Sequence, residues 1–311
     1  MSKIVVVGSY VVDLMSRTPH LPKPGETVLG GPFKMGPGGK GGNQVTAAAR
    51  CGSDVTFVTK LGDDLFGREA LKHFITENVN TQFIKIDPGQ ATGAALIAVD
   101  DRSENSIVVS LGACGTITEA DVLEAEEEIK EADIVLLQLE TSIEAVVSSI
   151  KLACDNGIPI ILNPAPFQKF PEDILYNVHY ITPNETEAFE LSGVEVTDEG
   201  TALAAARKIH EMGVGTVIIT MGSKGAFLYN GKEKGELVPG FKVEAVDTTG
   251  AGDAFNGGFA FGLSKGLPVR DAMIFGQAVA ALSVTKIGTA PAMPYEHEIK
   301  DFLALKGIRA V

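Results

Sequence analysis

The sequence has no tryptophan and only three cysteines among its 311 residues. Cys51, Cys114 and Cys154 are far apart, odd in number and form no CxxC pair, so neither a disulfide framework nor a zinc site is expected. No apolar run approaches the length of a transmembrane helix, and the apolar stretch before Gly8 is too short for a signal-peptide core. We therefore expect a cytoplasmic protein without membrane contact.

Basic residues are scarce relative to acidic ones, 26 against 40, which gives a net charge of −14. This negative charge argues against a nucleic acid or an anionic membrane as the main partner. An anionic substrate would need local backbone N–H groups or a few cations at its site. The chain does have 45% hydrophobic residues and 35 glycines, enough for a large core with many tight turns.

Strand and helix patterns alternate through most of the chain. Aliphatic and β-branched runs predict buried strands at residues 4–7, 134–139, 158–162, 178–182 and 216–220. Helical patterns lie between them at residues 119–131, 143–154 and 201–212, and Thr118 and Asp121 are placed to cap the first. The alternation predicts an α/β protein with a mostly parallel central sheet covered by helices on both faces.

Two stretches interrupt this alternation. Residues 10–35 contain too many prolines and glycines for a full helix, and residues 92–111 have the pattern of a β-hairpin with strands near 94–99 and 106–110. They suggest a small β-sheet appendage that serves as a lid. No linker or repeat divides the chain, so we expect one domain over residues 1–311.

Polar residues follow four of the predicted strands. Ligands bind beyond the carboxyl ends of parallel strands, so these residues indicate a shared site, although ordinary loop polarity would explain any one of them. The residues are Glu140, Asn163, Asn184, Glu187, Thr220, Ser223 and Gly225.

The segment Val246–Leu263, "VDTTGAGDAFNGGFAFGL", carries the strongest chemical signal. Backbone N–H groups at the start of its apolar helix can bind an anion and stabilise charge on a transferring phosphoryl group, and Gly250 and Gly252 allow close approach. Asp253 then stands where a carboxylate accepts the proton of an attacking hydroxyl. The alternative is an ordinary first-turn aspartate favoured by the helix dipole.

Asn184 and Glu187 lie three residues apart on one predicted helical turn. An amide and a carboxylate in this arrangement can hold Mg²⁺ through its waters. The same residues also fit a capped helix start with Asn184 as N-cap, and the two roles are compatible.

The glycine-rich stretch Met35–Gln44, "MGPGGKGGNQ", fails the known phosphate-binding patterns. A Walker A loop needs glycine where Lys34 stands and serine or threonine where Gly41 stands. Gly36, Gly38 and Gly41 match G-x-G-x-x-G, but "GPFKM" before them is a poor strand for a dinucleotide fold. An alanine-rich helix starts near Asn43, so the loop offers amides, a lysine and a side-chain amide to a polyhydroxylated ligand.

Five ordered motifs resemble the ribokinase-like, or pfkB, carbohydrate kinases. They are "GGKGGNQ" ending at Gln44, "NPAP" (Asn163–Pro166), "TPNETEA" (Thr182–Ala188), "TMGSKG" (Thr220–Gly225) and "DTTGAGDAF" (Asp247–Phe255). The resemblance covers nearly the whole chain and is strongest to the ribokinase and deoxyribokinase branches. It implies a three-layer αβα sandwich, a small β-sheet lid that is often shared in a homodimer, and transfer of the ATP γ-phosphoryl group to the 5-hydroxyl of a pentose.

The resemblance also implies roles for individual residues. Asp253 is the base, and Gly250, Ala251 and Gly252 form the anion hole. The sugar would bind to Val11, Asp13, Gly39, Lys40, Asn43, Glu140 and Asp253. The nucleotide would contact Asn184, Thr220, Gly222, Ser223, Lys224, Gly225, Gly252 and Gln277. Glu187 would order Mg²⁺ and its waters, and K⁺ would bind Asp247, Thr249, Ser283, Lys286, Gly288 and Ala292, largely through carbonyls.

One departure from the ribokinase pattern concerns the substrate. Ribokinases usually have asparagine where Val11 stands in "GSYVVD", and the deoxyribokinases resemble this chain with an apolar residue there. The change favours 2-deoxy-D-ribose slightly over D-ribose. A nucleoside stacked on Tyr10 or Phe33, a sugar phosphate held by Arg17, Lys23, Lys34 and Lys40, and a non-catalytic sugar sensor remain alternatives.

Overall fold

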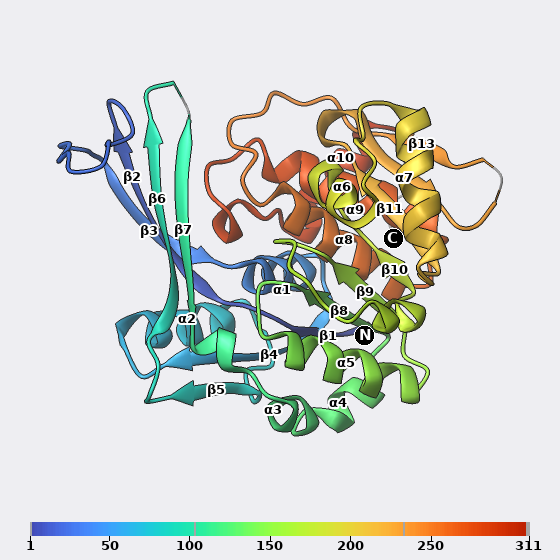
Figure 1. Cartoon of the computed structure of the whole chain (residues 1–311), viewed down its shortest axis with the longest axis horizontal. Helices are drawn as coiled ribbons and strands as arrows, with labels where there is room; N and C mark the ends of the chain where they lie inside the picture. Colours follow the sequence, from blue (N-terminus) through green and yellow to red (C-terminus); the bar gives the residue numbers. More distant parts are fainter. Residues whose placement is uncertain (1, 103, 233, 309–311) are drawn as a thin grey trace.

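The computed structural model describes residues 2–102, 104–232 and 234–308. A central sheet runs through the body, and a four-stranded sheet stands beside it (Figure 1). The central order is β13-β12-β11-β10-β9-β8-β1-β4-β5, parallel except for β12 and β13. The strands are β1 (Lys3–Val7), β4 (Asp54–Gly62), β5 (Ile84–Asp87), β8 (Ile134–Gln138), β9 (Ile160–Asn163), β10 (Tyr180–Ile181), β11 (Thr216–Thr220), β12 (Gly225–Tyr229) and β13 (Glu236–Pro239).

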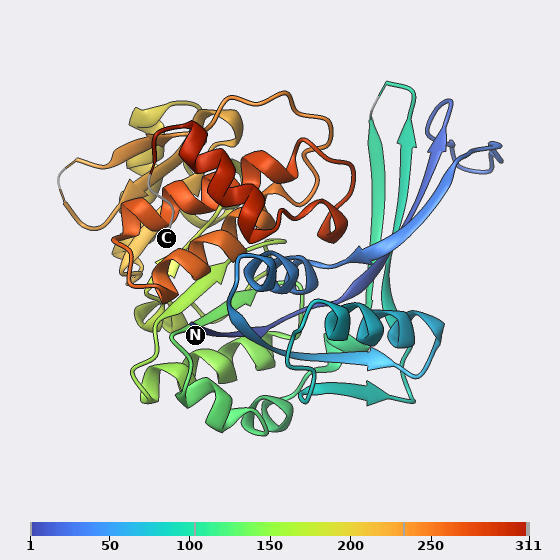
Figure 2. The ribbon, with the colours of Figure 1, turned by 180° about the vertical axis from the view of Figure 1, so that it is seen from behind.

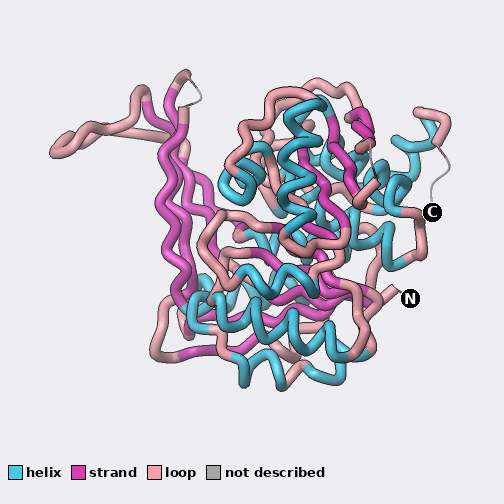
Figure 3. Tube along the Cα trace, turned by 45° about the vertical axis from the view of Figure 1, so that its right-hand side comes forward, coloured by secondary structure: helices cyan, strands magenta, loops and turns pink. Residues whose placement is uncertain are grey.

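The small sheet contains the two stretches that interrupt the alternating pattern. Its order is β3-β2-β6-β7, with β2 (Val11–Thr18), β3 (Phe33–Gly38), β6 (Thr92–Asp100) and β7 (Asn105–Gly112). These strands extend away from the body (Figure 3). We call this sheet the lid. Its apolar side chains Leu96, Ile107 and Val108 are about half exposed or more, at 56%, 48% and 60%.

Helices cover both faces of the central sheet. The ten α-helices in the described part of the chain are α1 (Lys40–Arg50), α2 (Leu65–Thr76), α3 (Glu119–Leu123), α4 (Glu126–Lys130), α5 (Ile143–Asp155), α6 (Glu185–Ser192), α7 (Glu199–Glu211), α8 (Ala251–Ser264), α9 (Val269–Ser283) and α10 (Glu296–Leu305). Short 3₁₀ helices are η1 (Ala113–Thr116), η2 (Glu172–Asn177), η3 (Gly222–Lys224) and η4 (Ala290–Ala292).

Successive side chains of β1 point to opposite faces of the sheet, and both faces are apolar, so helices must cover both. Val5 and Val7 pack into the core formed with α3 to α7, whereas Ile4 and Val6 pack into the core formed with α1, α2, α8 and α9. Figure 2 shows the second group of helices in front of the sheet. The predicted α/β fold, with its parallel sheet and lid, is therefore confirmed.

Several predicted boundaries were wrong. The single helix over residues 119–131 is two helices, α3 and α4, separated by a tight turn in which the amide of Ala125 bonds to the carbonyl of Val122. Thr118 and Asp121 do form the predicted capping box. The strand expected at 158–162 begins only at Ile160, because Pro159 has no N–H for the ladder. Strand β10 is limited to residues 180–181, and "GPFKM" contributes to strand β3.

Within the described residues, no helix combines the length and apolarity needed to span a bilayer.

Candidate active site

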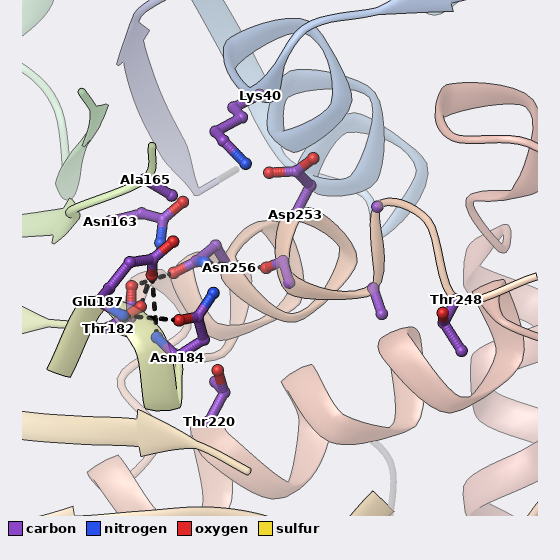
Figure 4. Close-up of a pocket in the computed structure, with 13 residues that line it drawn as sticks. Lys40, Asn163, Ala165, Thr182, Asn184, Glu187, Thr220, Thr248, Asp253 and Asn256 are labelled. Carbon is purple, nitrogen blue, oxygen red and sulfur yellow. Dashed lines mark hydrogen bonds between the residues drawn. The ribbon is translucent and has the colours of Figure 1, made fainter. Parts of the chain in front are cut away.

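The carboxyl ends of β9 to β11 meet the start of α8 around a polar cavity of about 160 Å³ (Figure 4). Of the polar residues expected to share a site after the strands, Asn163, Asn184, Glu187 and Thr220 line this cavity, whereas Glu140, Ser223 and Gly225 do not. The wall consists of Lys40, Asn163, Ala165, Thr182, Asn184, Glu187, Thr220, Thr248, Gly250, Ala251, Gly252, Asp253 and Asn256. A larger cavity of about 730 Å³ shares part of this wall and extends over β12 and α9.

The start of α8 faces both cavities. Gly250 is the N-cap with φ 76°, a left-handed conformation that favours glycine, and a side chain added to Gly252 would meet nothing within 4 Å. Amides in the first turn have no acceptor within a helix, so they can bind an anion. The amide of Ala251, predicted to belong to the anion hole, already donates to the Thr248 carbonyl at 3.2 Å. It is therefore less available to an anion than an amide without an acceptor.

Asp253 is buried beside this helix start. Its Oδ2 accepts a hydrogen bond from Asn43 Nδ2 and its Oδ1 accepts one from Gln44 Nε2, both at 2.9 Å. Burial raises the pKa of Asp253 above its ordinary value, while Lys40, Gln44 and Asn43 act in the opposite direction. A carboxylate in this setting can take a proton from a hydroxyl held in the cavity.

The start of α1 is fixed by a carboxylate from the neighbouring strand end. Gly39 has no side chain to cap the helix, and Glu140 Oε2 accepts from the backbone N–H of Lys40 at 2.7 Å and from Ser9 Oγ at 2.6 Å. This cap explains why α1 begins at Lys40 and not, as predicted, near Asn43. Burial would lower the pKa of Lys40, but Asp253, Glu140 and Glu187 together raise it.

The glycines of the glycine-rich stretch Met35–Gln44 permit close contacts within the protein. A side chain at Gly38 would lie 2.3 Å from Asp13 Oδ1, and one at Gly41 would lie 2.6 Å from the Ser9 carbonyl oxygen. The loop thus packs against β2 and the end of β1.

Val11 and Asp13 lie two residues apart on β2 and therefore share one face of the lid sheet. Thr289 Oγ1 lies 3.0 Å from Asp13 Oδ2. Burial raises the pKa of Asp13 to about 6, opposed by the Thr289 hydrogen bond and increased by Glu140 and Asp253. Val11 is buried and paired with Gly38 and Gly93.

Asn184 and Glu187 form the predicted capping box at the start of α6 and also line the polar cavity. Asn184 Oδ1 accepts from the Glu187 amide at 2.8 Å, and Glu187 Oε2 accepts from the Asn184 amide at 2.9 Å. Burial raises the pKa of Glu187, with the Asn184 amide and Lys40 opposing it. Glu187 and Asp253 are the carboxylates on the wall of this cavity, and few protein ligands are what Mg²⁺ held through its waters requires.

The residues expected around a monovalent cation lie on three segments near Gly250. Asp247 accepts from the amides of Thr249 and Gly288, both at 3.0 Å, and these bonds hold its pKa below the ordinary value despite burial. Ser283 Oγ donates to the Ala280 carbonyl, and Lys286 Nζ pairs with Glu298, so these side chains are engaged elsewhere. The backbone carbonyl of Ser283 also accepts from the amide of Lys286, at 3.1 Å.

Arg50 fixes the loop that contains Ala292. The guanidinium pairs with Glu77 through both oxygens, at 2.9 and 2.6 Å, and NH1 donates to the carbonyls of Ala290, Pro291 and Met293. The carbonyl of Ala292 lies within this clamped segment. Arg50 was not predicted as a site residue, because the carbonyls it binds in this loop are 240 or more positions away in the sequence.

The larger cavity contains most residues expected to contact nucleotide, among them Asn184, Thr220, Gly222, Ser223, Gly225, Gly252 and Gln277. Gln277 Nε2 donates to the Val238 carbonyl at 2.9 Å. Lys224 differs, because its Nζ donates to the Thr197 carbonyl at 2.8 Å and it is absent from the described walls of both cavities. The predicted contact of its side chain with nucleotide therefore has no counterpart here.

The two aromatic residues considered for a nucleoside platform lie in different surroundings. Tyr10 is buried against Phe74, with ring centroids 5.6 Å apart, whereas Phe33 is exposed on the lid. Neither lines a described cavity, and the same holds for Arg17, Lys23 and Lys34 among the described residues.

Comparison with known proteins places nearly the whole chain among carbohydrate kinases. Residues 1–296 match the model of the pfkB family of carbohydrate kinases. Ribokinase of Haemophilus influenzae is 42% identical, over 96% of this chain and 98% of the relative. Deoxyribokinase of Salmonella typhimurium is 38% identical, over 97% of this chain and 99% of the relative.

Two solved structures are also similar. The crystal structure of ribokinase from Thermotoga maritima has a TM-score of 0.88 and 36% identity, covering 98% of this chain and all of the other. The structure of Arabidopsis thaliana ribokinase complexed with ribose and ATP has a TM-score of 0.90 and 30% identity, covering 97% of this chain and 99% of the other.

Proposed function

This chain belongs to the pfkB family of carbohydrate kinases, and we propose that it transfers the γ-phosphoryl group of ATP to the 5-hydroxyl of D-ribose or 2-deoxy-D-ribose. The observation that carries the proposal is Asp253, a buried carboxylate at the open start of α8, where the polar cavity joins the larger one. Relatives named ribokinase and deoxyribokinase, and a ribokinase bound to ribose and ATP, support the choice of substrates.

The residues divide the reaction between them. Asp253 takes the proton of the sugar hydroxyl, whose oxygen forms the new bond to the γ-phosphorus while the bond to the β–γ bridging oxygen breaks and ADP leaves. The amides at Gly250–Gly252 and the Lys40 ammonium face the phosphoryl group and offset its charge. Asp13, Gly39, Asn43 and Glu140 bind sugar hydroxyls, and the larger cavity takes the nucleoside.

Two metal ions complete the proposed site. Glu187 would hold Mg²⁺ through water, and the carbonyls near Asp247, Thr249, Ser283, Lys286, Gly288 and Ala292 would hold K⁺. When bound, these ions would add positive charge beside the phosphates. The chain's own contribution is the rigid placement of these groups by the capping box, the Asp247 hydrogen bonds and the Arg50 clamp.

Val11 is the residue we expect to set the sugar preference, with a slight lean to 2-deoxy-D-ribose. It shares a face with Asp13, and an apolar side chain gives no hydrogen bond to a 2-hydroxyl. The ratio of kcat/KM for the two sugars tests this, and Val11→Asn should move the ratio toward D-ribose by about tenfold or more. A strong preference of the wild-type enzyme for D-ribose would exclude the proposed preference for 2-deoxy-D-ribose.

We further propose that two lids pair in a homodimer. Leu96, Ile107, Val108 and Val109 are exposed apolar side chains on the two paired strands of the hairpin, and β7 is an edge strand. Such edges aggregate unless they are covered. Sedimentation that gives only the monomer at assay concentrations would contradict the pairing.

The enzymatic role is tested with Asp253→Asn. A kinase should lose phosphoryl transfer by at least about a hundredfold while sugar binding persists, because the amide keeps the shape of the carboxylate but not its basicity. Turnover is measured by ADP release and binding by calorimetry, with D-ribose, 2-deoxy-D-ribose and nucleosides as substrates. A non-catalytic sensor would release no ADP above background even as wild type.

A further inference from the structure

A chain of buried side-chain amides lies behind the Asp253 carboxylate. Gln138, the last residue of β8, donates from Nε2 to Gln44 Oε1 at 2.7 Å. Gln44 in turn donates from Nε2 to Asp253 Oδ1 at 2.9 Å and to Asn163 Oδ1 at 3.1 Å. Both glutamines have an exposed fraction of 0%. Neither is among the residues expected above to bind sugar, nucleotide or metal.

The donors and acceptors of this chain have one consistent arrangement. Asn163 donates from Nδ2 to the Thr182 carbonyl, so its oxygen must face Gln44, and an ionised Asp253 only accepts. Gln44 must therefore present its NH₂ group to both, which leaves its oxygen facing Gln138. Gln138 then has to present its own NH₂ group. A reversed Gln44 amide would set oxygen against oxygen at both Asp253 and Asn163.

We propose that Gln44 is a positioning residue for phosphoryl transfer, which fixes the Asp253 carboxylate with its free lone pairs toward the sugar hydroxyl. The proposal rests on the base role of Asp253 in the proposed function. Asn43 on Oδ2 and Gln44 on Oδ1 together oppose rotation of the carboxylate, because rotation would break both bonds. Lys40 lies on the cavity side of Asp253 and stabilises its negative charge. Gln44 lies on the core side and fixes the orientation of the carboxylate.

The charged groups facing Asp253 come from four elements. Lys40 at the start of α1 favours the ionised carboxylate, whereas Glu140 after β8, Glu187 on α6 and Asp13 on β2 oppose it. Burial opposes it as well. Gln44 and Asn43 are neutral donors that favour ionisation, so loss of Gln44 should raise the pKa of Asp253.

Gln44→Met tests the role, because methionine keeps the length of the side chain but has no N–H donor. Gln168→Met is the matched control, since the Gln168 amide donates to the Leu139 and Thr141 carbonyls beside β8 and does not touch Asp253. For each protein, kcat and KM are measured with both pentoses from about pH 5.5 to 9. The Asp253 carboxyl is titrated by ¹³C NMR in the intact protein, assigned by its absence in Asp253→Asn.

We expect Gln44→Met to lower kcat at neutral pH by about 10- to 100-fold, with KM changed less than about threefold. The acid limb of the kcat profile and the Asp253 titration should both move up by roughly one pH unit, so alkaline pH restores part of the rate. Gln168→Met should keep the wild-type profile. Gln138→Met, which only releases Gln44, should give a smaller shift in the same direction.

A loss of rate that is equal at all pH values, or an Asp253 titration that stays at the wild-type pH in both glutamine variants, would overturn the positioning role. Full turnover in Asp253→Asn would instead overturn the base assignment of the proposed function. The carboxyl titration separates the two failures, because it reports the effect of Gln44 on Asp253 whether or not Asp253 accepts the proton.

Discussion

Two helices begin at glycine-rich segments in this site, but only one presents its first turn to a ligand. At α1 the amide of Lys40 is bound to Glu140, and Gly41 is packed against Ser9. At α8 a side chain on Gly252 would meet open space, and Gly250 and Gly252 line the cavity. Glycine content alone therefore does not locate an anion site. The deciding feature is how many first-turn amides the protein has already supplied with an acceptor: three at α1, those of Lys40, Gly41 and Gly42, against that of Ala251 at α8.

The largest effect is expected where α8 is open. Gly252→Val places a branched side chain in the space over the first turn, so phosphate can no longer approach the amides. We expect kcat to fall by about 10²- to 10³-fold, comparable to loss of oxyanion stabilisation. Thermal unfolding should change little, because nothing lies within 4 Å of the added Cβ. Turnover close to wild type would show that α8 is not the phosphate site.

At α1 the same kind of substitution should act on folding. The Cβ of Gly41→Ala would lie 2.6 Å from the Ser9 carbonyl oxygen and 2.7 Å from the Ser9 nitrogen. We expect the free energy of unfolding to fall by about 1–3 kcal/mol, as for other overpacked sites. Gly36→Ala is the control, since Gly36 has open space around it. Equal unfolding midpoints in urea for the two variants would contradict the expectation that only Gly41→Ala is overpacked.

A smaller effect is expected from the cap of α1. Glu140→Gln keeps the shape of the side chain but weakens two charge-assisted hydrogen bonds, from Ser9 and from the Lys40 amide. We expect a loss of about 1 kcal/mol in unfolding free energy together with weaker sugar binding. Calorimetry of sugar binding and thermal unfolding at pH 7 measure both. Unchanged stability would mean that α1 begins at Lys40 without this cap.

The last effect concerns Asp13 and, unlike the others, depends on pH. Burial raises its pKa from 3.8 to about 6. Between these values the folded protein holds a proton that the unfolded chain has lost, so stability falls as pH rises toward 6 and is then constant. Asp13→Asn removes this loss, and we expect its unfolding temperature to exceed that of the wild type by a few degrees at pH 7 but not near pH 4. An equal difference at both pH values would contradict this.

The sequence was informative where one segment determines its own structure. Thr216–Thr220 is a strand as predicted, and Thr118 and Asp121 form the expected capping box, because these features depend on a few neighbouring residues. The carboxyl ends of the strands also meet as expected. The start of α1 was misplaced, because its cap comes from Glu140, a hundred positions away in the sequence.

The parts of the site that the sequence did not predict are contacts between segments far apart in the chain. Gln44 follows Asn43 at the end of the glycine-rich stretch Met35–Gln44, yet its hydrogen bond to Asp253 spans 209 positions. No local sequence pattern distinguishes it from a surface glutamine. Thr289 and Asp13 are 276 positions apart. Lys224 lies within a recognisable motif, but its amine donates to the carbonyl of Thr197, 27 positions earlier in the segment between α6 and α7.

The close packing of α1 against α8 has a consequence for how the molecule is made. A Cβ on Gly257 of α8 would lie 2.5 Å from that of Ala47 on α1, so the first and last quarters of the chain meet almost backbone to backbone. During synthesis, Asn43 and Gln44 emerge about two hundred residues before the carboxylate they bind. Until then these two amides have no carboxylate to bind, so the contact between α1 and α8 can form only after most of the chain has been made.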